Sequence, residues 1–101
     1  MSENNFTQQQ VDTLSRMLHN LHQTNNNPML KMKIYEIKVY SNERQELYLS
    51  YFNEFPQDAH TGIELFLIQI DAIGNNTIMN DTMDKFQIQK YISNLTEIKL
   101  K

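Results

Sequence analysis

The stretch that decides the fold is MLKMKIYEIKVYSNERQELYLSYF, residues 29–52. Aliphatic, β-branched and aromatic side chains flank a polar turn at 41–45, a pattern typical of two strands joined as a hairpin. Within 29–40 the alternation changes phase between Ile34 and Tyr35. A β-bulge, or a strand covered on both faces, would explain that change.

The second strand of this hairpin, residues 46–52, carries apolar or aromatic side chains on both of its faces. If helices cover only one face of the sheet, one of the two sets looks outward. One set is Leu47, Leu49 and Tyr51, and the other is Tyr48 and Phe52.

Toward the N-terminus, Thr7 and Gln10 form the T-x-x-Q pattern of a capping box. Apolar residues then recur at helical spacing, which predicts a helix over residues 8–23. The Asn-rich run that ends in Pro28 terminates this helix, and residues 1–6 are expected to fray.

Toward the C-terminus, residues 63–74 are open to two interpretations. A Thr61/Glu64 capping box and Gly74 at the end favour a helix, whereas the near-continuous apolar run rich in isoleucine favours a buried strand. The strand is the preferred interpretation. A last helix is expected from a Thr82 cap to about Asn94, followed by a short edge strand within 96–101.

The whole chain of 101 residues is therefore expected to be a single α+β domain. We expect a three- or four-stranded, mostly antiparallel sheet, with the N-terminal and the C-terminal helix on one face. The other face of the sheet is expected to be partly open, because two helices cannot cover both.

The composition excludes several classes of protein. The chain has no cysteine, which rules out disulfides and thiolate metal sites. The first ten residues lack a signal-peptide pattern, and no apolar run is long enough to span a bilayer, so a cytoplasmic location without membrane contact is expected. Abundant Asn, Lys and Ile with few Ala, Gly, Pro and Arg suggest an AT-rich genome, compatible with a phage or mobile element.

The sequence contains no motif for catalysis or for a cofactor. His19 and His22 share a helical face, but no third ligand has a recognisable spacing, so no metal site is expected. The carboxylates are scattered, and two glycines do not make a phosphate-binding loop. We therefore expect a protein that is not an enzyme.

The best functional indication is the aromatic content of the hairpin, because exposed aromatic side chains favour protein interfaces. The sequence predicts a small protein that binds a larger protein, as an inhibitor, immunity-type protein or adaptor. The expected partner-binding residues are Tyr35, Tyr48 and Phe52, with a polar rim of Arg44, Glu46 and Glu54.

Two other partners are compatible with the sequence. Lys31 and Lys33 alternate with Tyr35 on one strand face, as in a single-stranded nucleic-acid-binding module, where bases stack on aromatic rings. The net charge of −3 counts against that alternative, because binding to phosphate favours a basic surface. A second copy of the chain is the other partner, if the outward aromatic face forms a homodimer.

Overall fold

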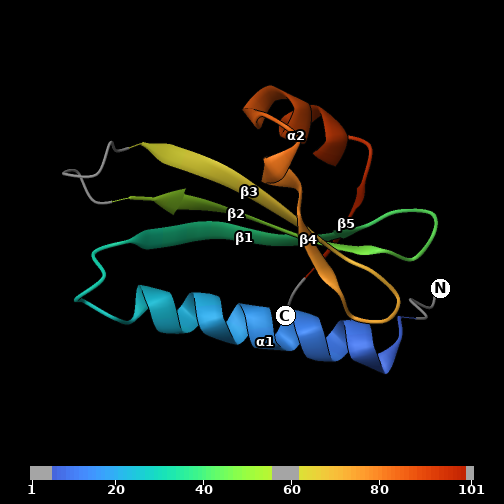
Figure 1. The fold of residues 1–101 in the computed structure, drawn as a ribbon, viewed down its shortest axis with the longest axis horizontal. Helices are drawn as coiled ribbons and strands as arrows, with labels where there is room; N and C mark the ends of the chain where they lie inside the picture. Colours follow the sequence, from blue (N-terminus) through green and yellow to red (C-terminus); the bar gives the residue numbers. More distant parts are fainter. Residues whose placement is uncertain (1–5, 56–61, 100–101) are drawn as a thin grey trace.

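The computed structural model describes residues 6–55 and 62–99 (Figure 1). The elements in chain order are α1 (Gln8–Asn25), β1 (Lys33–Ser41), β2 (Leu47–Glu54), β3 (Ile63–Ile70), β4 (Asn76–Ile78), the 3₁₀ turn η1 (Met79–Asp81), α2 (Lys85–Ile92) and β5 (Thr96–Ile98). The α+β class is confirmed.

Helix α1 begins where the capping box places it. The Thr7 hydroxyl accepts a hydrogen bond from the Gln10 amide at 3.1 Å, and the Gln10 side chain accepts one from the Thr7 amide at 2.9 Å. The helix runs two residues further than predicted, to Asn25. Residues 1–6 were expected to fray. Phe6 instead packs against the core, and residues 1–5 lie outside the described residues.

The strands form one antiparallel sheet in the order β4-β3-β2-β1-β5, so the sheet has five strands where three or four were expected. The predicted hairpin is β1–β2, with Tyr40 opposite Tyr48 and Tyr35 opposite Phe52. The register shifts between Tyr35 and Lys38, and Glu36 has a φ of 54°. The change of phase seen in the sequence is therefore a bulge.

The apolar run at 63–70 is the strand β3, as preferred from the sequence. Gly74 lies in the turn to β4 at a φ of 88°, and a Cβ there would lie 2.9 Å from the Gln9 carbonyl oxygen. Glycine is thus required by a left-handed turn packed on α1, and does not end a helix. The extra strand β4 begins two residues after Gly74, at Asn76.

The expectation that both helices cover one face is wrong, because α1 and α2 lie on opposite faces of the sheet (Figure 1). The physical reason is that β2 and β3 carry apolar residues at consecutive positions, so both faces need a cover. We call the two sides the α1 face and the α2 face. The α1 face buries Val39, Leu47, Leu49 and Ile70, and the α2 face buries Tyr48, Leu65 and Leu67 under Ile88 of α2.

Helix α2 is shorter than predicted, and its cap is Asp84 instead of Thr82. The Asp84 carboxylate accepts from the Gln87 amide at 2.9 Å, and the Gln87 side chain accepts from the Asp84 amide at 2.8 Å. This second capping box sets the start of α2 at Lys85, and Thr82 ends η1 instead. The chain then forms β5 against β1, which confirms the predicted edge strand.

Candidate functional site

The structure separates the six predicted partner-binding residues into two groups on the α2 face. Tyr35, Phe52 and Glu54 lie in the halves of β1 and β2 that are farthest from the turn between these strands, where Phe52 packs at the margin of the cluster under α2. Arg44 and Glu46 lie at the other end, beside the turn between β1 and β2. Tyr48 belongs to the second group, but it is 0% exposed, so the expectation that its ring looks outward is wrong.

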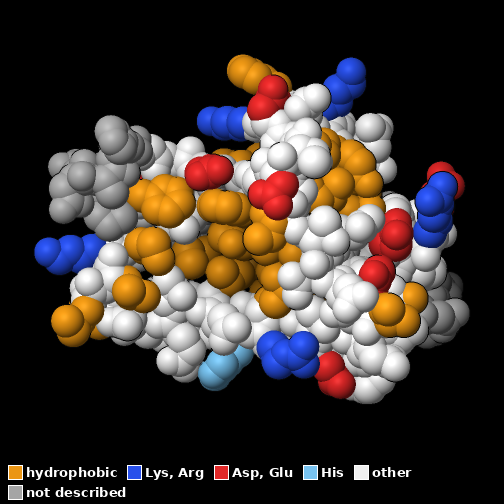
Figure 2. Space-filling view, viewed as in Figure 1, with side chains coloured by type: hydrophobic (Ala, Val, Ile, Leu, Met, Phe, Trp, Pro, Cys, Tyr) orange, Lys and Arg blue, Asp and Glu red, His pale blue; other side chains and the backbone are white. Residues whose placement is uncertain are grey.

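We call the first group, with its cross-strand neighbours, the open end. Two rungs of side chains run across β1, β2 and β3 there. The inner rung is Tyr35, Phe52 and Leu65, and the outer rung is Lys33, Glu54 and Ile63. Hydrophobic side chains gather along β3 between the two helices in Figure 2.

The aromatic pair at the open end is well defined. The rings of Tyr35 and Phe52 stack with centroids 5.8 Å apart and planes 21° apart. The Lys33 ammonium lies 5.6 Å from the Tyr35 ring centroid, within reach of a cation–π interaction. Both rings are half-buried, and the neighbouring Ile63 is 48% exposed. The open end thus keeps the half-buried Tyr35 and Phe52 rings and the exposed Ile63 at the surface, whereas Leu65 is buried in the cluster under α2.

A groove connects the open end to α2. Its floor includes Phe52 and Leu65, and Ile92 of α2 forms one wall. Glu36 and Lys38 of β1 form the opposite wall. The groove has a volume of about 160 Å³. An apolar side chain of a partner could enter this groove while its backbone remains at the charged rim.

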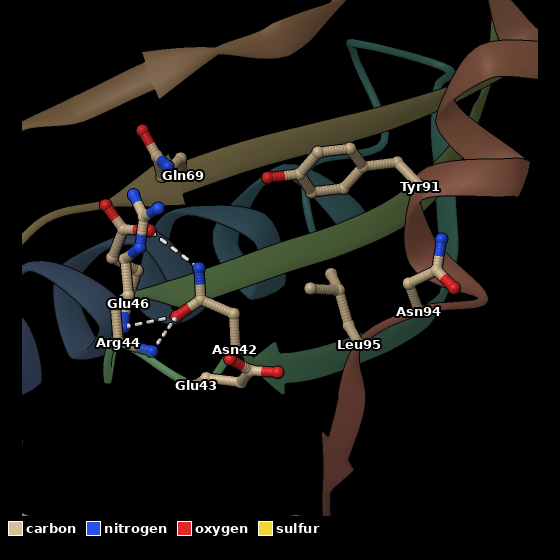
Figure 3. Close-up of a pocket in the computed structure, with 8 residues that line it drawn as sticks. All are labelled: Asn42, Glu43, Arg44, Glu46, Gln69, Tyr91, Asn94 and Leu95. Carbon is tan, nitrogen blue, oxygen red and sulfur yellow. Dashed lines mark hydrogen bonds between the residues drawn. The ribbon is translucent and has the colours of Figure 1, made fainter.

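The second group surrounds a polar pocket of about 440 Å³, shown with its eight labelled residues in Figure 3. Asn42 organises the turn at its edge, because its side-chain oxygen accepts from the amides of Arg44 and Glu46, both at 3.0 Å. Its side-chain nitrogen donates to the Glu46 carboxylate at 2.6 Å. Asn42 therefore holds both predicted rim residues in place.

Under this pocket, the Tyr48 hydroxyl is the centre of a hydrogen-bond network. It accepts from the side-chain nitrogens of Asn42 and Gln69, both at 3.1 Å, and lies 2.8 Å from the Tyr91 hydroxyl. Two accepted bonds fill its lone pairs, so its own proton is directed to the Tyr91 hydroxyl or to the Glu46 carboxylate, whose oxygen lies 3.5 Å away.

The pKa of the Tyr48 hydroxyl reflects its surroundings. Burial raises this pKa far above the usual value, and the bond to Tyr91 raises it further. The bond from Gln69 lowers it in part. Tyr48 is therefore a neutral, structural residue of the core.

The described lining of the pocket combines Arg44, Glu43 and Glu46 with several amides and the Tyr91 side chain. Within residues 6–55 and 62–99, no group of three or more His, Cys, Asp or Glu side chains could hold a metal ion. In the same ranges, no helix combines the length and apolar character needed to cross a membrane.

Sequence reasoning missed the β3 residues Ile63 and Leu65, and also Gln69, Tyr91 and Asn42. The first four join the site through strand pairing and helix docking, which leave no local signal. Asn42 could have been found, because an Asn at the start of a polar turn often accepts hydrogen bonds from the following amides. Comparisons of the chain with models of protein families, with curated proteins and with solved structures found no match.

Proposed function

We propose that this protein is a small non-enzymatic binding protein that acts on a larger protein through the open end of its α2 face. An inhibitor, an immunity-type protein or an adaptor encoded by a phage or mobile element would have this design. The observation that carries the proposal is the stacked pair Tyr35–Phe52, which stays half-exposed on a sheet face whose other end is closed by α2.

The surroundings of this pair have the anatomy of a protein interface. Apolar side chains form the centre, because Phe52 and Leu65 continue into the groove beside α2 and Ile63 extends the surface across β3. Charged residues form the rim. An apolar centre with a polar rim excludes water from the contacts that supply most of the binding energy.

The charge of the rim favours a protein over a nucleic acid. Lys33 and Lys38 are balanced by Glu36 and Glu54, so the exposed charges around the aromatic pair sum to zero. A nucleic-acid surface needs an excess of positive charge to release counterions from phosphates. Lys33 beside the Tyr35 ring is the one feature that supports the alternative, a single-stranded nucleic-acid-binding module.

The test compares two exposed aromatic surfaces. The double variant Tyr35→Ala/Phe52→Ala removes the pair at the open end, and Phe86→Ala removes a ring on α2 that is 80% exposed. The wild-type protein is used to isolate the partner from the source cell, and affinities are then measured with purified components. We expect the double variant to lose about 2 kcal/mol of binding free energy, roughly 30-fold, and Phe86→Ala to lose little.

Other results would redirect the proposal. A loss of binding only in Phe86→Ala would move the interface to α2. Micromolar binding of single-stranded DNA that weakens with salt and disappears in Lys33→Glu would favour the nucleic-acid alternative. Sedimentation of the wild type as a dimer, and of the double variant as a monomer, would make a second copy the partner at the open end.

A further inference from the structure

The long strands β1 and β3 lie next to the ends of the sheet, and their outer edges are only partly covered by other strands. β5 pairs with residues 39–41 of β1, and β4 pairs with residues 68–70 of β3. The remaining outer backbone groups are the kind of surface on which a strand of another molecule can add.

On each outer edge, an asparagine side chain occupies backbone groups that a strand would otherwise occupy. The Asn25 amide donates to the Ile34 carbonyl oxygen at 2.6 Å, and its oxygen accepts from the Ile34 amide at 2.7 Å. The Asn80 amide donates to the Leu65 carbonyl oxygen at 2.7 Å, and its oxygen accepts from the Leu67 amide at 3.1 Å. Each asparagine side chain thus donates and accepts one backbone hydrogen bond, as a residue of a neighbouring strand would.

The two edges differ in what else protects them. The β1 edge also has the bulge at Glu36 and the exposed charges of Lys33 and Lys38, which all oppose strand addition. The β3 edge beside Leu65 and Leu67 is covered by η1, which the two Asn80 bonds hold there. This edge has an apolar run from Leu65 to Ile68 and no charged residue between Leu65 and Ile70. Two β3 strands could therefore pair with each other without repulsion between charges.

We propose that Asn80 guards the β3 edge, and that without its side-chain amide β3 pairs with β3 of a second copy of this chain. Asn25 is less important for this purpose, because the bulge and the lysines protect β1 independently. The proposal concerns the edge of the sheet and stands apart from the binding surface at the open end.

The test is sedimentation velocity over a range of protein concentrations. Asn80→Ala and Asn80→Ser should self-associate as concentration rises, while Asn25→Ala and the exposed helix control Asn20→Ala sediment like the wild type. Asn80→Asp keeps an acceptor for the Leu67 amide and places a charge on the edge, so it should also sediment like the wild type.

Hydrogen exchange at the Leu67 amide separates pairing from simple destabilisation. At low concentration, exchange at this amide in Asn80→Ala should be about fivefold faster than in the wild type, because one hydrogen bond is lost. At high concentration the exchange should slow again, because the amide finds a partner in the second copy. Loss of stability alone would give fast exchange at every concentration.

The proposal is overturned if Asn80→Ala and Asn80→Ser are folded and sediment like the wild type throughout. Self-association of Asn80→Asp to the same degree would also overturn it, because a charge should block the edge. Unfolding of both Asn80→Ala and Asn80→Ser would show that Asn80 is needed for folding, and would equally reject a guarding role.

Discussion

The α1 face of the sheet is covered by an 18-residue helix, whereas the α2 face is covered by an eight-residue helix that stops short of the Tyr35–Phe52 pair. The buried hydrophobic cluster of the first face is aliphatic, and that of the second includes Tyr48, whose hydroxyl joins a hydrogen-bond network. One sheet therefore has a face that a long helix covers and a face that also leaves Tyr35, Phe52 and Ile63 partly exposed at its open end.

Two leucines that are each 0% exposed allow the strength of the two covers to be compared, because Leu49 faces α1 and Leu67 faces α2. We expect Leu49→Ala to lower the free energy of unfolding by about 4 kcal/mol and Leu67→Ala by about 2–3 kcal/mol. The short α2 can settle into the cavity more easily than α1. Urea unfolding measures both values, and an equal or reversed order would contradict the comparison.

Removal of one hydroxyl tests whether the network stabilises the α2 face. Tyr48→Phe removes the acceptor of the Gln69 amide and one of the two acceptors of the Asn42 amide, so we expect a loss of about 2 kcal/mol. Tyr91→Phe keeps those two bonds and should cost less, about 1 kcal/mol or below. Equal losses in the two variants would contradict the larger contribution expected from the two bonds that Tyr48 accepts.

The raised pKa of the Tyr48 hydroxyl makes the free energy of unfolding depend on pH in the alkaline range. Because burial raises the pKa of Tyr48 above the usual 10.0, the unfolded chain loses the proton first as pH rises. The stabilisation is therefore complete below pH 10 and is lost as pH rises through the folded-state pKa. Chemical unfolding at increasing alkaline pH should show a steeper loss in the wild type than in Tyr48→Phe. Parallel curves would assign the alkaline loss to other groups.

The smallest expected difference lies in the two helix caps. The Thr7 hydroxyl both caps α1 and donates to the Ala72 carbonyl oxygen at 2.5 Å, whereas Asp84 caps α2 at the surface. Thr7→Ala should cost about 1–2 kcal/mol and Asp84→Ala about 0.5–1 kcal/mol. Thermal unfolding of both variants gives the comparison, which fails if Asp84→Ala is the more damaging.

Local sequence patterns were sufficient to predict much of the fold. The capping box at Thr7 and the hairpin around 41–45 follow from neighbouring residues, and both are found in the structure. A bulge was one of two explanations for the change of phase after Ile34, and the structure has it between Tyr35 and Lys38. The candidate site was predicted less well, because alternation shows which side chains share a face but not which face a helix covers. Tyr48 and Phe52 share a face, yet only Tyr48 lies fully under α2.

The sequence by itself determined helix α1, the hairpin strands and the aromatic character of the hairpin, because these depend on periodicity and on contacts over a few residues. Only the tertiary structure decided that the helices lie on opposite faces, that Tyr91 meets Tyr48, and that Asn80 reaches Leu65 and Leu67. The physical reason is that these contacts join residues far apart in the chain, and their geometry is set by strand register and helix docking, which no local pattern encodes.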